Sequence, residues 1–168
     1  EKFVSFTILP GMYDQAISMQ DSTLRMDELP LPLYATSNAG DVPIVYSIES
    51  GPGSLYSDSL LAFSIGTIVV RASQSGTDVF LPGSTTSTIN ITKGIQLALF
   101  NLPESIDVGD VLDLNMFFYT NSGVTPIFEI INTGAQGNLA NGILTADGTG
   151  EITLRATIPS NPDWSDLA

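Results

Sequence analysis

Carboxylates are the abundant side chains in this sequence that could take part in chemistry. The 168-residue chain has 18 Asp and Glu against 5 Lys and Arg, a formal net charge of −13, and neither Cys nor His. It therefore builds no disulfides, no thiol nucleophile and no histidine-dependent triad, and it lacks the usual zinc ligands. The acidic balance also opposes binding to nucleic acid and to anionic membranes, because both depend on Lys and Arg.

Three of these carboxylates follow one another at intervals of three residues: Asp107, Asp110 and Asp113. Oxygen ligands on a loop can hold Ca²⁺, so these residues are the candidate calcium ligands. The segment lacks the EF-hand pattern, however, and in an extended strand this spacing directs neighbouring side chains to opposite faces. The alternative is a solvated turn followed by a strand. Apart from calcium, no cofactor or metal is expected.

No catalytic residue is expected. Two carboxylates can act as the pair of a glycosidase, but nothing in the sequence marks any pair as lying in a cleft. Arg71 and Arg155 recur in matching contexts. They either contact an acidic or sugar ligand twice, or form cross-strand ion pairs with neighbours such as Glu49 and Glu129.

Two short segments match a bacterial O-glycosylation acceptor pattern, in which Ser or Thr follows Asp. They are residues 21–23, DST, and 58–60, DSL. Both are expected in loops, where a modifying enzyme could reach Ser22 and Ser59. Three-residue patterns also arise by chance, so the alternative is that neither serine is modified.

The elements that position these residues are β-strands. Apolar and polar residues alternate in 44–49, 67–73, 88–92 and 151–157, and turn-forming residues separate these runs. This pattern predicts an all-β fold of the sandwich type. No apolar run approaches 18 residues and no basic-then-apolar leader opens the chain, so no membrane insertion is expected.

The chain also resembles itself. Residues 66–73 match 150–157 at a spacing of 84 (71 to 155), and residues 43–48 match 125–130 at a spacing of 82 (46 to 128). A further match of residues 9–10 with 102–103 implies about nine or ten additional residues in the first copy, within a long polar connection at 16–28. We therefore expect two tandem domains, 1–93 and 94–168.

The matched strands predict which side chains face each core. Tyr46 and Phe128 occupy equivalent positions and should be the central aromatics of the two domains. The inward side chains of the other matched strands should be Ile68, Val70 and Ala72 in the first copy and Ile152, Leu154 and Ala156 in the second.

The repeated residues resemble a known family. Residues 42–52, VPIVYSIESGP, and 66–76, GTIVVRASQSG, are similar to the bacterial immunoglobulin-like repeats of large surface and secreted proteins. Phe80 and Trp164 stand where those repeats have a closing aromatic. The resemblance implies two tandem immunoglobulin-like β-sandwiches. Such repeats serve as spacers in adhesins, gliding-motility surface proteins and polysaccharide-degrading enzymes.

The second domain is expected to lack its final strand. After Phe80 the first copy continues to Lys93 and includes a closing strand, whereas only four residues follow Trp164. An open sheet edge invites pairing. Either the sequence is a fragment of a longer chain, or a neighbouring repeat of the same or another chain donates a strand to repeat 2.

Together these features predict a structural protein and not an enzyme. We expect an acidic spacer or stalk segment of a bacterial extracellular surface protein or filament, acting in adhesion or motility, with neighbouring immunoglobulin-like repeats as its partners. The alternative is an accessory or carbohydrate-binding module of a secreted polysaccharide-degrading enzyme. Such a module should expose aromatic side chains, whereas most aromatics here are expected in core or end-packing positions.

Overall fold

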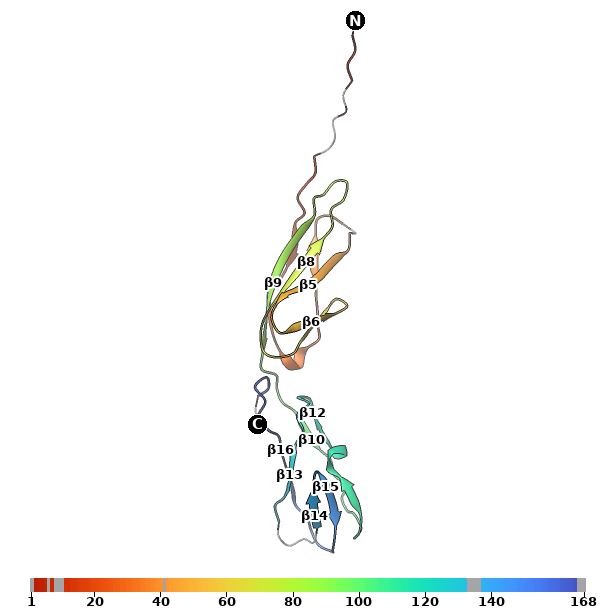
Figure 1. The fold of residues 1–168 in the computed structure, drawn as a ribbon, viewed down its shortest axis with the longest axis vertical. Helices are drawn as coiled ribbons and strands as arrows, with labels where there is room; N and C mark the ends of the chain where they lie inside the picture. The colour runs from red at the N-terminus through yellow and green to blue at the C-terminus, as the bar shows by residue number, and fades with distance from the viewer. Residues whose placement is uncertain (1, 6, 8–10, 41, 133–136, 166–168) are drawn as a thin grey trace. The chain divides into compact units, whose positions relative to one another are not determined.

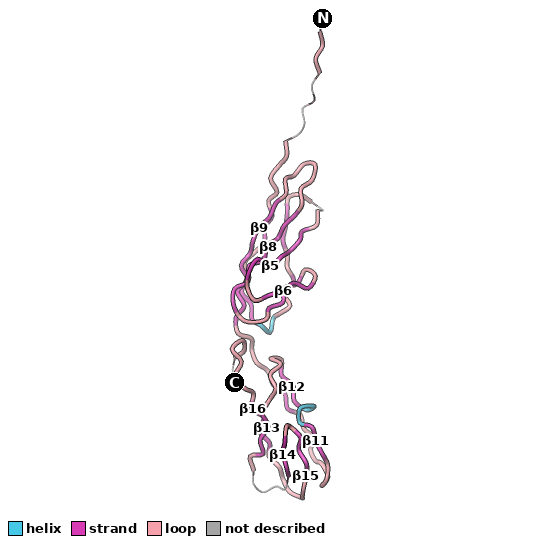
Figure 2. Tube along the Cα trace, viewed as in Figure 1, coloured by secondary structure: helices cyan, strands magenta, loops and turns pink. Residues whose placement is uncertain are grey.

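The computed structural model describes residues 2–5, 7, 11–40, 42–132 and 137–165. Over these residues the protein is all-β, as the alternating pattern predicted, with strands joined by turns and short 3-10 helices (Figures 1 and 2). Contacts within the chain divide it into two compact units, residues 1–92 and 93–168, which we call unit 1 and unit 2. In the described part of the chain, no helix is long and apolar enough to cross a membrane.

Unit 1 contains three sheets. The largest has the strand order β2-β9-β8-β5, in which β2 runs parallel to β9 and the other neighbours are antiparallel (Figure 1). A second sheet has the order β3-β7-β6, and β1 pairs with β4. The elements are β1 (Ile17–Met19), β2 (Ser22–Arg25), η1 (Met26–Glu28), β3 (Leu31–Pro32), β4 (Ala35–Ser37), β5 (Ile44–Ser50), β6 (Gly53–Tyr56), β7 (Ser59–Ala62), β8 (Gly66–Gln74) and β9 (Gly83–Thr92).

Side chains from the two larger sheets meet in one core. On β8, Ile68, Val70 and Ala72 are fully buried, while the residues between them are half-buried or exposed. This confirms the predicted inward face of the strand. Ile68 and Val70 belong to a single cluster with Leu60 of β7 and Ile89 of β9. Burying each of these large apolar side chains contributes about 2–3 kcal/mol, so the two sheets are held face to face.

The segment 16–28 is not the long polar connection predicted above. It contains β1, β2 and η1, and Leu24 of β2 is buried in the core. The backbone N–H of Arg25 donates to the Glu28 carboxylate at 2.7 Å, which closes the turn of η1. The polar residues of this segment therefore face outward from short strands, because a two-sided strand needs only every second residue to be apolar.

Unit 2 contains three antiparallel sheets, β10-β12, β11-β15-β14 and β13-β16. Its most buried apolar side chains are Leu114, Leu144 and Ala146. The elements are β10 (Ala98–Phe100), β11 (Val111–Asp113), η2 (Leu114–Phe117), β12 (Phe118–Thr120), β13 (Ile127–Ile130), β14 (Gly137–Ala140), β15 (Ile143–Ala146) and β16 (Leu154–Thr157).

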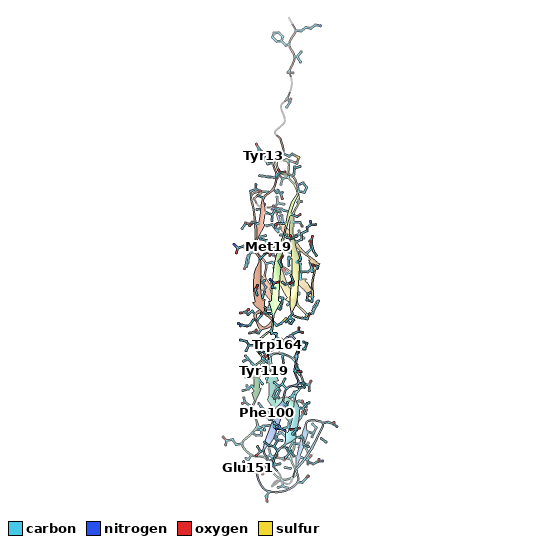
Figure 3. All side chains as sticks on the ribbon, turned by 90° about the vertical axis from the view of Figure 1, so that its left-hand side faces the viewer. Tyr13, Met19, Phe100, Tyr119, Glu151 and Trp164 are labelled. Carbon is cyan, nitrogen blue, oxygen red and sulfur yellow. The ribbon has the colours of Figure 1, made fainter. Side chains whose placement is uncertain are left out.

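Both predicted central aromatics pack inward. Tyr46 of β5 packs against the core cluster of unit 1. Phe128 of β13 contacts Phe100 and Phe118, with ring centroids 5.4 and 5.9 Å away, and Phe100 lies among the strands of unit 2 (Figure 3). Tilted aromatic contacts at these distances add to the gain from burial, so the three rings hold β10, β12 and β13 together.

The strand pairings of the two units have the same registers. Tyr46 of β5 lies opposite Ala72 of β8, and Phe128 of β13 lies opposite Ala156 of β16. In the hairpins, β6 pairs with β7 from Gly53 opposite Ala62, and β14 pairs with β15 from Gly137 opposite Ala146. Each hairpin position in unit 1 therefore recurs 84 residues later in unit 2 (53 to 137 and 62 to 146).

The two hairpin glycines also have the same surroundings. A Cβ built on Gly53 would lie 2.8 Å from Ile68 Cδ1, and one on Gly137 would lie 2.7 Å from Ile152 Cδ1. Contacts this short exclude any larger residue without a local shift. At both positions the end of a matched isoleucine side chain therefore lies directly over the glycine backbone, so that a larger residue would have to displace it.

The predicted insertion of nine or ten residues in the first copy is wrong. The backbone N–H of Ala16 donates to Asn38 Oδ1 at 2.8 Å, and that of Leu97 donates to Asn121 Oδ1 at 2.8 Å. These matched bonds give spacings of 81 (16 to 97) and 83 (38 to 121), which leave no room for the insertion. The match between residues 9–10 and 102–103 was therefore accidental, and residues 9 and 10 lie outside the described residues.

Candidate functional site

The three candidate calcium ligands lie on a turn and the strand that follows it. The backbone N–H of Asp107 donates to the Asp110 carboxylate at 2.9 Å, and that of Asp110 donates to the Asp107 carbonyl at 3.0 Å. Asp113 ends β11, and its carboxylate accepts 3.0 Å bonds from both the backbone N–H and the side-chain amide of Asn115. This geometry agrees with the second interpretation of the sequence, in which these residues form a turn followed by a strand.

The structure does not bring the three carboxylates together. Within the described ranges, no group of three or more acidic side chains has a geometry that could hold a metal ion. The Asp110 and Asp113 carboxylates instead stabilise the backbone of the turn and the start of η2, as capping side chains do. These residues therefore have structural roles that need no ion.

Arg71 and Arg155 form the predicted cross-strand ion pairs. Arg71 Nε lies 3.0 Å from Glu49 Oε1, and Arg155 Nε lies 3.0 Å from Glu129 Oε2. All four side chains are substantially exposed, so each pair contributes well under about 1 kcal/mol. Arg25 is the third paired arginine: a hydrogen bond from its side chain to Asp27 raises the pKa of its guanidinium.

The two candidate glycosylation sites are not in loops. Ser22 is the first residue of β2, opposite Ile89 of β9, and Ser59 is the first residue of β7, opposite Pro32 of β3. Both serines are half-buried. The prediction of a loop was wrong because Asp and Ser favour turns but also stand where a strand begins.

Six described aromatic side chains are exposed, while the other seven described aromatics are half-buried, in line with the prediction that most would pack in core or end positions. Tyr34 is 81% exposed and lies at the rim of two hollows in unit 1, with volumes of about 350 and 540 Å³. The second hollow is also lined by Tyr46 and Asp58. The exposed aromatics are Phe3, Tyr13, Tyr34, Tyr56, Phe63 and Tyr119.

Unit 2 has a groove of about 460 Å³, which we call the open groove. Its lining comes from residues 102–108, 148–152 and 154, together with Leu112, Leu144 and Ala146. The lining is mixed: apolar side chains such as Ile106, Ile152 and Leu154 stand beside the carboxylates of Glu104, Asp107 and Glu151. The sequence had singled out three of these residues for other reasons, Asp107 as a candidate calcium ligand and Ile152 and Leu154 as inward-facing, but it predicted no groove; the expected absence of a closing strand was the signal for one.

The open groove lies where unit 1 has β9. In unit 1, β9 fits between β2 and β8, with Leu24 opposite Ile91 on one side and Ile68 opposite Ile89 on the other. In the part of unit 2 that the structure describes, β16 pairs with β13 alone, and no strand corresponds to β9. Among the described residues of unit 2, the side of β16 that faces away from β13 therefore has no paired strand.

No protein-family model matches the chain, and no curated protein matches its sequence.

Proposed function

We propose that this chain is a structural segment of a bacterial extracellular surface protein or filament, made of two tandem immunoglobulin-like β-sandwiches. The observation that carries the proposal is the recurrence of strand registers, hairpins and glycine environments in units 1 and 2. Repetition of one sandwich without a repeated polar cleft favours a spacer, because a spacer needs only length and stability.

Charge and composition support the same role. A net charge of −13 keeps copies of such a segment apart and soluble. Hydrophobic packing and cross-strand pairs stabilise each unit without any cysteine. We therefore propose a role in adhesion or motility in which the chain positions other parts of the protein and carries out no reaction.

The test replaces the segment in the bacterium that encodes it. An unrelated pair of β-sandwiches of equal length should preserve surface display and adhesion or motility, whereas deletion of the segment should impair them. Surface display is measured with an antibody against a tag on the parent protein. Loss of function with the unrelated pair would show that these residues do more than span a distance.

The alternative is a carbohydrate-binding module of a secreted polysaccharide-degrading enzyme. The exposed Tyr34 ring beside two hollows of unit 1 favours it, because sugar rings stack on exposed aromatic faces. A glycan array decides the matter: binding that is lost in Tyr34→Ala but kept in Tyr119→Ala supports this module. Tyr119 is a suitable control because it is also exposed but lies on β12 of unit 2.

A further inference from the structure

The groove-facing residues of unit 2 are less buried than their counterparts in unit 1. Ile68 and Val70 of β8 are fully buried beneath β9. Their counterparts 84 residues later, Ile152 and Leu154, are only half-buried and line the open groove. Unit 2 thus has a groove with partly exposed apolar side chains, and a strand, β16, that pairs on one side only among the described residues.

In unit 1, β9 fills the place that corresponds to the open groove. The residue two positions after the end of β9, Gly94, forms an isolated β-bridge, and this bridge allows the equivalent of β9 to be located in the sequence. The backbone N–H of Gly94 donates to the Asp163 carbonyl at 3.0 Å. The Gly94 carbonyl accepts from the backbone N–H of Ser165 at 2.9 Å. Tyr13 makes the same two bonds in unit 1, with Val79 and Leu81, both at 2.8 Å. Tyr13 and Trp164 mark these two bridges in Figure 3.

This equivalence of Tyr13 and Gly94 assigns a counterpart of β9 to the first residues of unit 1. Residues 2–11, KFVSFTILPG, precede Tyr13 at the spacing with which residues 83–92 of β9 precede Gly94. In β9 the inward residues are every second one, including the buried Ser87, Ile89 and Ile91. The matching positions 81 residues earlier are Phe6, Ile8 and Pro10, and Val4 corresponds to the half-buried Thr85.

The described residues of this segment present apolar surface to solvent. Phe3 and Val4 are 89% and 87% exposed. Free apolar side chains gain about 1.5–3 kcal/mol each on full burial. The segment and the open groove are therefore complementary in register and polarity, and each lacks a partner for its apolar side chains among the described contacts.

We propose that residues 2–11 of one copy insert as a strand into the open groove of unit 2 in a second copy, so that copies join head to tail. The proposal rests on the equivalence of the two units in the proposed function. The registers of unit 1 predict the pairing: Val4 opposite Ala156, position 6 opposite Leu154, and position 8 opposite Ile152. Val4 faces the core, and Phe3, corresponding to the exposed Ser84, faces solvent.

Association of the 168-residue chain tests the proposal with a matched pair of variants. Sedimentation velocity should show oligomers that grow with concentration. Val4→Asp should weaken association at least tenfold, whereas Phe3→Asp should change it less than twofold, because only Val4 is on the face of the inserted strand that turns toward the core. Equal effects of the two variants, or a wild-type chain that stays monomeric at 500 µM, would overturn the proposal.

Engineered cysteines test the register, since the natural chain has none. Thr7→Cys in one preparation and Thr153→Cys in another should form a mixed disulfide on oxidation, because opposite residues on paired strands bring their Cβ atoms within about 5.5 Å. Thr7→Cys with Thr157→Cys is the control, four positions out of register. Equal yields of both mixed disulfides would contradict the pairing.

A grafted strand separates failure of this inference from failure of the proposed function. A chain in which residues 83–92 are repeated directly after position 166 carries the β9 sequence at its equivalent place in unit 2. It should unfold at a higher temperature than the wild type and should no longer self-associate. A stabilised graft combined with a monomeric wild type would overturn strand exchange alone. A graft without any stabilising effect would overturn the equivalence of the two units as well.

Discussion

At the scale of single residues, the carboxylates of unit 2 stabilise backbone turns. Asp113 accepts bonds from the backbone and the side chain of Asn115 at the start of η2, and the Asp110 carboxylate accepts from Asp107 N–H. Both bonds satisfy N–H groups that have no other partner at the start of a turn or helix. Each of these two carboxylates is therefore fixed in position by hydrogen bonds from the N–H groups of residues two or three positions away.

Replacement of Asp113 distinguishes this capping role from a calcium site. Asp113→Ala should lower the free energy of unfolding by about 1 kcal/mol, and Asp113→Asn should restore most of it, since the amide oxygen still accepts the bond. Chemical unfolding is measured with 1 mM Ca²⁺ and with chelator. A wild-type midpoint that rises with calcium, in a manner that Asp113→Ala abolishes, would establish the metal site instead.

The orientation of residues on the matched strands could be predicted from the sequence, whereas their environment could not. In a strand every second side chain points to the same face. The alternation of apolar and polar residues therefore predicted the burial of Ile68 and Val70 and the ion pairs of Arg71 and Arg155. The places of Ser22 and Ser59 did not follow. A strand as short as β2 or β7 has too few residues to show alternation, and β9 and β3, the strands opposite Ser22 and Ser59, are distant in the sequence.

At the scale of elements, the hairpins β6–β7 and β14–β15 were not predicted. The dipeptide Asn141-Gly142 between β14 and β15 is a strong signal for a two-residue hairpin turn, and both residues have positive φ. Ser57 takes the equivalent place in unit 1 with φ 53°, close to the 52° of Asn141. Serine is a weak signal for this conformation, so the sequence of unit 1 alone conceals its hairpin.

Exchanging these two turn residues tests the equivalence of the hairpins. Asn tolerates the left-handed region better than Ser, because its side chain bonds to the local backbone. Ser57→Asn should therefore stabilise unit 1, and Asn141→Ser should destabilise unit 2, each by a few tenths of a kcal/mol and at most about 1 kcal/mol. Thermal unfolding measures both effects. Shifts of the same sign in the two variants would contradict a shared turn geometry.

Substituting the matched isoleucines, Ile68 and Ile152, measures how much coverage by β9 contributes to the stability of the core. Ile68 is fully buried under β9, and Ile152 borders the open groove. Ile68→Ala should cost about 2–5 kcal/mol, as for a cavity in a closed core, and Ile152→Ala clearly less. In the grafted chain the cost of Ile152→Ala should rise to that of Ile68→Ala. Equal costs in the ungrafted chain would show that unit 2 is already closed around Ile152.

At the scale of the whole molecule, the two units differ in how completely their matched strands are paired. Unit 1 has a four-stranded sheet with β8 paired on both sides, while the described part of unit 2 pairs β16 on one side only. Strand edges and half-buried cores open at lower free energy than closed ones. We therefore expect β16 to open more readily than β8 in the isolated 168-residue chain.

Amide hydrogen exchange at low micromolar concentration, below any association, should therefore rank the units. Amides of β16 should exchange faster than those of β8 at equivalent positions, because few pairings protect them and local opening exposes them. Raising the concentration should slow exchange in β16 and leave β8 unchanged, since a strand from a second copy would pair with β16 alone. The grafted chain should show slow exchange in β16 at every concentration. If β16 and β8 exchange equally in the dilute wild-type chain, the groove is closed in solution and a single copy is already complete.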